Sequence, residues 1–353
     1  DSSGIPLNPW PILLDHYSVT VPEQYGGVGL DLISFLFSFE AMSYWAHSFA
    51  ASWMGTEIVF AHSLAINANE EQKAKYLGLV CNGGIGAFAL TESGAGSDAM
   101  GSMRTTAKRD GDNYILNGSK MFISNGPVAD AIVVYARTAP ELGNKGISCF
   151  IVEKKFVGFS VAQKLDKMGW RGSPTGELVF DNCVVPAANL VGSLNKGVSI
   201  LMGGLNLDRI SSCFHMIGVS QRALDLAIEV AKTREQFGKP IGSFQLVQGL
   251  LADAYTDLES MRGITYQLAK EIVKQESESS SGRREIQRRT AAALLHCARA
   301  FNRLLSNAVQ VHGGTGYILE TEVNRLYRTG KLMEIGAGTT QMRQVIIAED
   351  LLR

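Results

Sequence analysis

The stretch GELVFDNCVVPAANLVGSLNKGVSILM, residues 176–202, contains the change of pattern that decides the fold. Its first part is a β-rich run, and after Asn195 apolar residues recur with the period of a helix. Upstream, from about Ala87, Gly, Asn, Asp and Pro separate further short β-rich pieces: NYILNG, AIVVYA, GISCFIVE and GFSVAQ. We therefore expect a compact antiparallel β-domain over residues 87–192.

The chain on both sides of this β-rich region has the pattern of helices. Residues 30–79 carry long apolar stretches such as DLISFLFSFEAMSYW, with few internal Gly or Pro, which predicts buried helices. We expect an N-terminal helical domain over residues 1–86, incomplete at its start. After residue 193 come three long helical segments, which predict a helical bundle over residues 193–353. This α+β multi-domain order excludes a single doubly wound sheet, because strands and helices do not alternate.

Charge and composition exclude several classes of protein. Lys plus Arg number 33 against 34 for Asp plus Glu, a balance that provides no broad field for nucleic acid or an anionic membrane. The five cysteines are scattered singly, and neither they nor the histidines have metal-ligand spacing, so we expect reduced thiols, no disulfide and no zinc. The sequence contains no run of eighteen apolar residues, which a membrane span would need. The start, DSSGIPLNPWP, lacks the regions of a signal peptide and resembles a trimmed N-terminus.

Two short motifs in the β-rich region have the residues that a phosphate or flavin site needs. TESGAGSDAMGS, residues 91–102, is a tight turn with exposed amides and hydroxyls, although alone it also fits an ordinary Gly-rich turn. MFISNG, residues 121–126, places a flat aromatic and a hydroxyl two residues apart on one strand face. The polar stretch QESESSSGRRE, between two of the long helices, is interpreted as a solvated turn.

Four further segments occur with these two: KMGWRGSPTGELVFDNCVVP, REQFGKPIGSFQLVQ, QVHGGTGY and AGTTQMR. In this order and spacing, the six segments resemble the acyl-CoA dehydrogenase family of flavoproteins, from YGGVGL onward. The resemblance implies an N-terminal helical domain, a middle β-domain and a C-terminal four-helix bundle. It also implies bound FAD between the β-domain and the bundle, with the adenylate end reaching a neighbouring subunit.

The resemblance assigns cofactor contacts position by position. The flavin ring and phosphates would contact Leu90, Thr91, Ser97, Phe122 and Ser124. A second subunit would hold the adenosine diphosphate with Arg234, Phe237, Gln245, Gln310 and Gly314, and Thr339 and Gln341 would complete the site. Phe122 stands where the family often has Trp, and either side chain offers a π-face to the ring. The planar fork of Arg234 suits a pyrophosphate.

The catalytic base is the least regular part of the pattern. In this family a carboxylate removes the α-proton of an acyl-CoA while the β-hydrogen leaves as hydride, and many members carry that glutamate in a segment like YEGT. The matching residues here, Gly336 to Thr339, include no carboxylate. Isovaleryl-CoA dehydrogenases, a branch of the family, instead carry the base in a stretch like LDLER. The matching LNLDR predicts Asp208 as the base, about 1.5 Å shorter in reach than Glu.

Other interpretations of the acidic residues stay open. Asp208 also fits a helix-terminal Asp that the macrodipole stabilises, and Glu334 or Glu92 are alternative bases. Gly336, in place of a common Tyr, would leave space for a short or branched acyl group. The Ala337 N–H would polarise the thioester carbonyl, and Gly338 would let the chain turn close to the ligand. Ser97, Asn206 and Arg209 are the remaining predicted substrate contacts. Ser199, Asn206, Thr329 and Gly330 depart from the family pattern.

The resemblance predicts a FAD-dependent dehydrogenase of a short or branched, isovaleryl-CoA-like substrate, with electron-transfer flavoprotein as acceptor and a homotetramer, a dimer of dimers, as the assembly. The compartment would be the mitochondrial matrix in a eukaryote and the cytoplasm in a bacterium. The alternatives are an acyl-CoA oxidase, a dehydrogenase of a cyclic or unusual thioester, and a flavin-loaded acyl-CoA-binding protein without catalysis.

Overall fold

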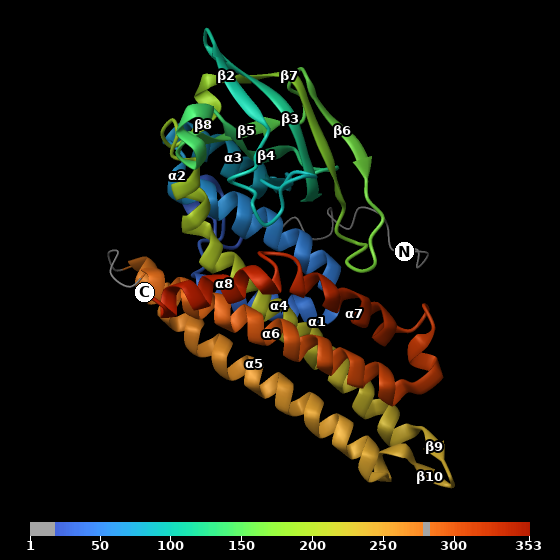
Figure 1. Cartoon of the computed structure of the whole chain (residues 1–353). Helices are drawn as coiled ribbons and strands as arrows, with labels where there is room; N and C mark the ends of the chain where they lie inside the picture. The colour runs from blue at the N-terminus through green and yellow to red at the C-terminus, as the bar shows by residue number, and fades with distance from the viewer. Residues whose placement is uncertain (1–17, 278–282) are drawn as a thin grey trace. The chain divides into compact units, whose positions relative to one another are not determined.

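The computed structural model describes residues 18–277 and 283–353, which form two compact units. Of the described residues, the first unit contains 18–35, 51–167 and 171–205, and the second contains 36–50, 168–170 and 206–353 without the gap. The predicted order of helices, β-sheet and helices is confirmed (Figure 1). The start of the chain and the middle of the QESESSSGRRE stretch lie outside the described residues.

The sheet of the first unit is mixed rather than purely antiparallel. Its strands are β1 (Gly86–Ala89), β2 (Thr106–Asp110), β3 (Asn113–Ser124), β4 (Ala131–Arg137), β5 (Ile147–Glu153), β6 (Phe159–Lys164), β7 (Thr175–Pro186) and β8 (Leu190–Val191). The order is β6-β7-β3-β2-β4-β5-β8, and β1 pairs with β4. The expected antiparallel pairing holds for β3 with β7 and β4 with β5, but β1 and β2 run parallel to β4. The long connection between β1 and β4 allows this, because parallel strands need a crossover.

The central strands are buried on both faces, which explains their continuous apolar sequences. Ile132 and Val134 of β4 pack in one hydrophobic cluster with β3 and β7 residues, whereas Val133 and Tyr135 pack in another with helical residues. Those helical residues lie in a π-helical segment (Gly55–His62), in α2 (Ser63–Asn67) and in α3 (Glu70–Cys81). A capping box of Asn69 and Gln72 begins α3.

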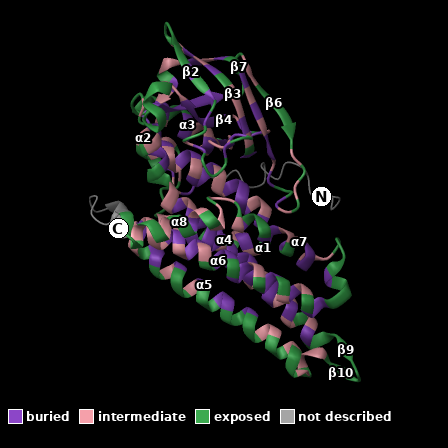
Figure 2. Ribbon diagram, in the orientation of Figure 1, coloured by how far each residue is buried: buried purple, intermediate pink, exposed green. Residues whose placement is uncertain are grey.

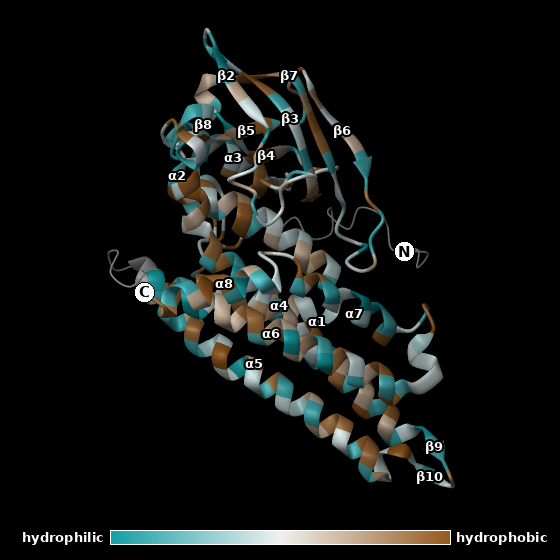
Figure 3. Ribbon diagram, in the orientation of Figure 1, coloured by the Kyte–Doolittle hydropathy of each residue, from teal (hydrophilic) through white to brown (hydrophobic). Residues whose placement is uncertain are grey.

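The second unit is the predicted helical bundle. It contains most of α4 (Gly197–Thr233), α5 (Gln245–Ser277), α6 (Arg283–His312), α7 (Glu322–Gly330), α8 (Thr340–Leu351) and part of α1 (Leu32–Met54). Helix α6 packs against α5, α7 and α8. Figure 2 shows buried and exposed residues alternating along α5, and Figure 3 shows the same alternation in hydropathy. This is the pattern of a helix with one face in a core.

Two general expectations can be compared with the structure. Each of the five cysteines is a free thiol, and four of them are buried. Among the described residues, no helix is long and apolar enough to cross a membrane.

Candidate active site

The Gly-rich loop of the first unit is built on a buried ion pair. Lys120 of β3 donates to Glu92 Oε1 and to the Leu90 carbonyl, each at 2.9 Å. The Glu92 carboxylate also accepts hydrogen bonds from the backbone N–H groups of Arg104 and Thr105 and from the Thr105 hydroxyl. Burial opposes ionisation of Glu92, but these hydrogen bonds and the Lys120 charge hold its pKa below the ordinary value. Glu92 is therefore a structural carboxylate, and the structure does not support it as a base.

Phe122 is presented to solvent by an irregularity in β3. The register between β3 and β7 shifts between Lys120 and Ile123, and Phe122 has a φ of +62°, which L-residues rarely adopt. Phe122 is 64% exposed, and Ser124 is also exposed, whereas Ile123 between them is buried. The Met121 N–H donates to the Thr91 carbonyl at 2.8 Å, so the Leu90–Thr91 segment lies beside this strand. Ser97 is exposed within the adjoining loop.

These residues of the first unit fit a flavin. An exposed aromatic held at an unfavourable φ is costly unless something covers the ring. The neighbouring Gly94 and Gly96 have no atom within 4 Å of an added Cβ, so the loop has open space beside it. Leu90, Thr91, Phe122 and Ser124 are therefore brought together by the pairing of β3 with the start of the loop.

The predicted diphosphate residues belong to the second unit, at the junctions of its long helices. β9 (Glu235–Gln236) and β10 (Lys239–Pro240) form a hairpin after α4, with Phe237 and Gly238 both at positive φ in its turn. Phe237 is 93% exposed, and Gln245 and Gln310 are exposed. The Arg234 guanidinium donates to the His312 carbonyl at 3.0 Å and lies 3.8 Å from a Cβ built on Gly313. The contact joins the hairpin to the Gly313–Gly314 turn.

The predicted base of the second unit interacts electrostatically with two buried arginines. Asp208 is partly buried on α4, and burial raises its pKa to about 6 although the charges of Arg209 and Arg343 oppose the rise. Burial also lowers the pKa of Arg343 to about 10, and it lowers that of Arg209. A carboxylate with a pKa near neutrality can both accept and release a proton at physiological pH.

The small residues that precede α8 form a strained turn. Ala337 has a φ of +53° and Gly338 a φ of +87°. The Thr339 hydroxyl accepts from the Met342 N–H and so caps α8, whereas Gln341 is exposed. Asn206 of α4 accepts a hydrogen bond from Thr290 of α6 at 3.1 Å. Glu334, the other alternative base, pairs with Lys331 at 2.6 Å.

Two charged residues of these arrangements were not found from the sequence. Lys120 had no assigned role, because strand alternation places it on the face of Phe122 and Ser124 rather than in the interior. Arg343 lies in AGTTQMR, but no pattern in that segment showed that its side chain folds back to the Gly336 carbonyl. For Lys120, the available signal was a cation between the small Ser119 and the apolar Met121.

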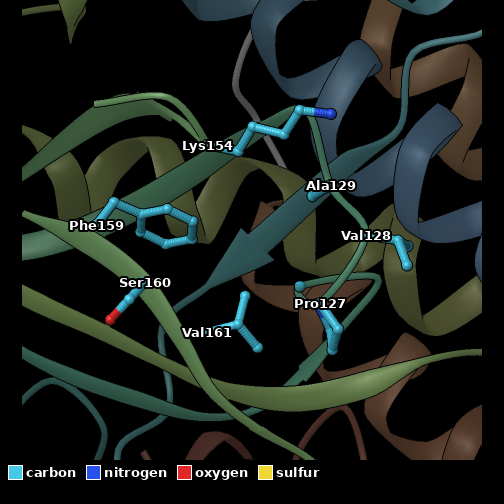
Figure 4. A pocket seen from close by; sticks show the side chains of 8 residues that line it. Pro127, Val128, Ala129, Lys154, Phe159, Ser160 and Val161 are labelled. Carbon is cyan, nitrogen blue, oxygen red and sulfur yellow. The ribbon is translucent and has the colours of Figure 1, made fainter. Parts of the chain in front are cut away.

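A pocket of about 300 Å³ opens elsewhere in the first unit (Figure 4). It is lined by Gly126, Pro127, Val128, Ala129, Lys154, Phe159, Ser160 and Val161. Lys154 at its edge pairs with Asp130. None of the predicted site residues lines this pocket.

Comparison with known proteins gives one consistent family. Three family models match: the acyl-CoA dehydrogenase N-terminal domain at residues 14–84, the middle domain at 87–183 and the C-terminal domain at 195–352. The chain is 41% identical to a mitochondrial 2-methylacyl-CoA dehydrogenase and to a mitochondrial isovaleryl-CoA dehydrogenase, both of Solanum tuberosum. Each alignment spans 98% of this chain and 83% of the relative.

Solved structures agree with this. Butyryl-CoA dehydrogenase from Megasphaera elsdenii has a TM-score of 0.91 and 36% identity, over 98% of this chain and 89% of that one. The FAD complex of PigA has a TM-score of 0.89 and 28% identity, also over 98% and 89% of the two chains.

Proposed function

The chain belongs to the acyl-CoA dehydrogenase family, oxidoreductases that act on CH–CH groups, and on that premise we propose that it oxidises a short or branched acyl-CoA to the 2-enoyl-CoA. Members of the family are FAD flavoproteins, and the proposed cofactor is FAD. The observation that carries the proposal is Asp208, a partly buried carboxylate of α4 that interacts electrostatically with the buried Arg209 and Arg343. It supplies a base although Gly336–Thr339 has none.

The proposed chemistry starts with the α-proton of the thioester. Asp208 takes this proton on a carboxylate oxygen, and the Ala337 N–H donates a hydrogen bond to the thioester carbonyl as negative charge develops there. Bound FAD supplies the acceptor for the β-hydrogen, which leaves as hydride. Partial burial of Asp208 makes it basic enough for this task, whereas an exposed Asp would be a weaker base.

Cofactor binding is proposed for the residues predicted from the sequence. In the first unit, Leu90, Thr91, Ser97, Phe122 and Ser124 would contact the flavin and its phosphates. In the second unit, Arg234, Phe237, Gln245, Gln310 and Gly314 would hold the adenosine diphosphate of a neighbouring subunit's cofactor, and Thr339 and Gln341 would contribute near α8. The exposure of Phe122 and Phe237, both at positive φ, supports roles in binding rather than in the core.

Substrate size is proposed from the small residues. Gly336 carries no side chain, and the left-handed turn at Ala337–Gly338 exposes backbone there. This favours an acyl group that is short or branched near the thioester, such as isovaleryl. Arg209, Asn206 and Ser97 are the further proposed substrate contacts. The relatives named for 2-methylacyl-CoA and isovaleryl-CoA support a branched substrate.

Partners and location follow the same reasoning. We propose electron-transfer flavoprotein as the electron acceptor and a homotetramer as the assembly. The exposed Phe237, Leu246 and Tyr317 of the second unit support association between copies. A mitochondrial matrix or a bacterial cytoplasmic location suits this function.

The test is to mix the FAD-loaded protein with isovaleryl-CoA without oxygen and to measure the absorbance of oxidised flavin at about 450 nm. Rapid bleaching supports the proposal, and Asp208→Asn is the matched control that must not bleach. A spectral shift without bleaching for isovaleryl-CoA and for a panel of straight and branched thioesters would instead identify an acyl-CoA-binding protein. Hydrogen peroxide release in air, at the rate of substrate oxidation, would identify an oxidase.

A further inference from the structure

Arg343 connects two parts of the proposed catalytic machinery. It lies in the first turn of α8, and its side chain is fully buried. Its Nη2 donates to the Gly336 carbonyl at 2.6 Å. Its Nε and Nη1 atoms are also buried and have no hydrogen-bond partner among the described residues. A buried guanidinium without full pairing is costly, so this residue needs an explanation.

The hydrogen bond fixes the direction of the next amide. The Gly336 C=O and the Ala337 N–H belong to one planar trans peptide unit, in which they point in opposite directions. Holding the Gly336 oxygen on the guanidinium therefore turns the Ala337 N–H away from Arg343. No described residue of the second unit accepts a hydrogen bond from that N–H. The amide is thus fixed in direction and available to a ligand.

This turn also needs an external restraint. Ala337 adopts a left-handed conformation that costs an L-residue about 1–2 kcal/mol. Within the turn, Gly336 N–H donates to the Leu332 carbonyl at 2.8 Å, and this bond leaves the Gly336–Ala337 peptide itself unrestrained. The Arg343 hydrogen bond supplies the restraint.

The charge of Arg343 acts on the proposed base. The titratable groups that interact most strongly with it are Asp208, Arg209 and the buried Cys213 thiol of α4, together with Glu334. Two cations beside one carboxylate favour the ionised form of that carboxylate. Without Arg343, burial of Asp208 would be opposed by Arg209 alone.

We propose that Arg343 is a positioning residue for the dehydrogenation: it aims the Ala337 amide through the Gly336 carbonyl. The inference rests on the proposed function. Arg343 contacts no reacting atom in this role.

Two variants separate the hydrogen bond to Gly336 from the charge of Arg343. Arg343→Met removes the charge and the donors, whereas Arg343→Lys keeps the charge and a donor one atom shorter. Arg288→Gln is the matched control, because Arg288 of α6 pairs with Asp350 of α8 at 2.8 Å, away from the turn. Arg288→Gln loosens α8 in general, but it leaves the hydrogen bond that fixes the direction of the Ala337 amide.

The first readout needs no turnover. Calorimetry compares an acyl-CoA thioester with the S-alkyl-CoA thioether that lacks the carbonyl oxygen, on each FAD-loaded variant. The thioester used is an acyl-CoA with sulfur in place of the β-carbon. It has no β-hydrogen to release as hydride, so it is not oxidised during the titration. We expect Arg343→Met to lose most of the wild-type preference for the thioester, Arg343→Lys to keep part of it and Arg288→Gln to keep all of it.

The second readout is the reductive reaction. We expect Arg343→Met to lower the maximal bleaching rate about 100-fold with little change in the half-saturating substrate concentration, because the amide acts mainly in the transition state. The pH midpoint of bleaching should rise in Arg343→Met and stay near wild type in Arg343→Lys.

An unchanged thioester preference in Arg343→Met overturns the inference, as does an equal loss in Arg288→Gln. If Arg343→Met does not fold, Arg343→Lys decides, and its thioester preference must fall below that of the wild type. If none of the acyl-CoA thioesters bleaches the flavin of the wild-type protein, the proposed function fails. The preference for the thioester over the thioether still decides the role of Arg343.

Discussion

The Lys120 ammonium lies 2.9 Å from the Glu92 carboxylate, where the lysine side chain is fully buried and the glutamate side chain nearly so. Lys120 is on β3 and Glu92 is in the Gly-rich loop, so the pair joins the two segments that carry Thr91 and Phe122. Each charge is compensated mainly by the other and by hydrogen bonds. The loop therefore depends on a pair that cannot lose one member without cost.

Lys120→Met is expected to destabilise the protein by about 3–5 kcal/mol, because it leaves the buried Glu92 carboxylate without its cation. Urea unfolding measures the change. The double variant with Glu92→Gln should recover most of the stability, since a neutral amide needs no counter-charge. Equal stability of the single and double variants would show that the pair does not act as a unit.

Strand β3, from Lys120 to Ser124, shows which features of the first unit the sequence predicts and which it does not. Alternation along MFISNG predicts Phe122 and Ser124 on one face, and both residues are exposed. Alternation alone would also place Lys120 on that face, but Lys120 is buried, because the irregularity between Lys120 and Ile123 changes the phase of the strand. A register shift depends on pairing with β7, which a local sequence pattern does not contain.

Phe122→Ala should lower the FAD content of the purified protein severalfold without lowering the thermal stability of the FAD-free protein. The ring is exposed and its backbone is strained, so its removal costs no core packing. Phe122→Trp is the control and should retain FAD. The measurement is the ratio of flavin to protein absorbance after gel filtration. Full retention of FAD by Phe122→Ala would remove this residue from the proposed site.

In the second unit too, local sequence patterns predict some features, whereas interactions between distant residues are not predicted. The long helices and the small-residue turn before α8 follow from local patterns, whereas the hairpin after α4 was not predicted. The electrostatic interaction of Asp208 with Arg343 does not follow from local patterns either, because these residues are far apart in the chain and only the folded bundle brings their charges within range. Sequence reasoning placed Asp208 through the family resemblance and gave Arg343 no role.

Glu57 provides a prediction on stability and pH. It lies in the π-helical segment, and its Oε1 accepts from the Thr20 N–H at 2.5 Å and from the Thr20 hydroxyl at 2.7 Å. Burial raises its pKa to about 7, against the Thr20 hydrogen bonds. The folded state thus binds this proton more tightly than the unfolded state. The contribution to stability is full below the unfolded pKa and is lost as pH rises through about 7.

Glu57→Gln removes this titration. It should stabilise the protein at pH 8 by at most about 3 kcal/mol, because each pKa unit corresponds to about 1.4 kcal/mol, and it should have little effect near pH 4. Chemical denaturation at the two pH values measures the difference. A gain in stability that is the same at both values would mean that Glu57 does not titrate in this range.

Asp208 gives the sharpest test of the reaction itself. Its carboxylate must be ionised to take a proton, and burial raises its pKa to about 6. The bleaching rate of the free enzyme with limiting substrate should therefore rise with pH through about 6 and level off above it. An ordinary exposed Asp would place this rise well below pH 5. Stopped-flow absorbance from pH 5 to 8 measures the profile.

Substitutions at Asp208 separate a base from a structural acid. Asp208→Asn should slow bleaching at least 100-fold, because it keeps the size and removes the proton acceptor. Asp208→Glu should remain active, since it restores the longer carboxylate. Glu334→Gln is the matched control and should bleach at nearly the wild-type rate, because Glu334 pairs with Lys331. If Asp208→Asn bleached normally and Glu334→Gln did not, the base would be Glu334, and the charge cluster of Arg209 and Arg343 around Asp208 would have only a structural role.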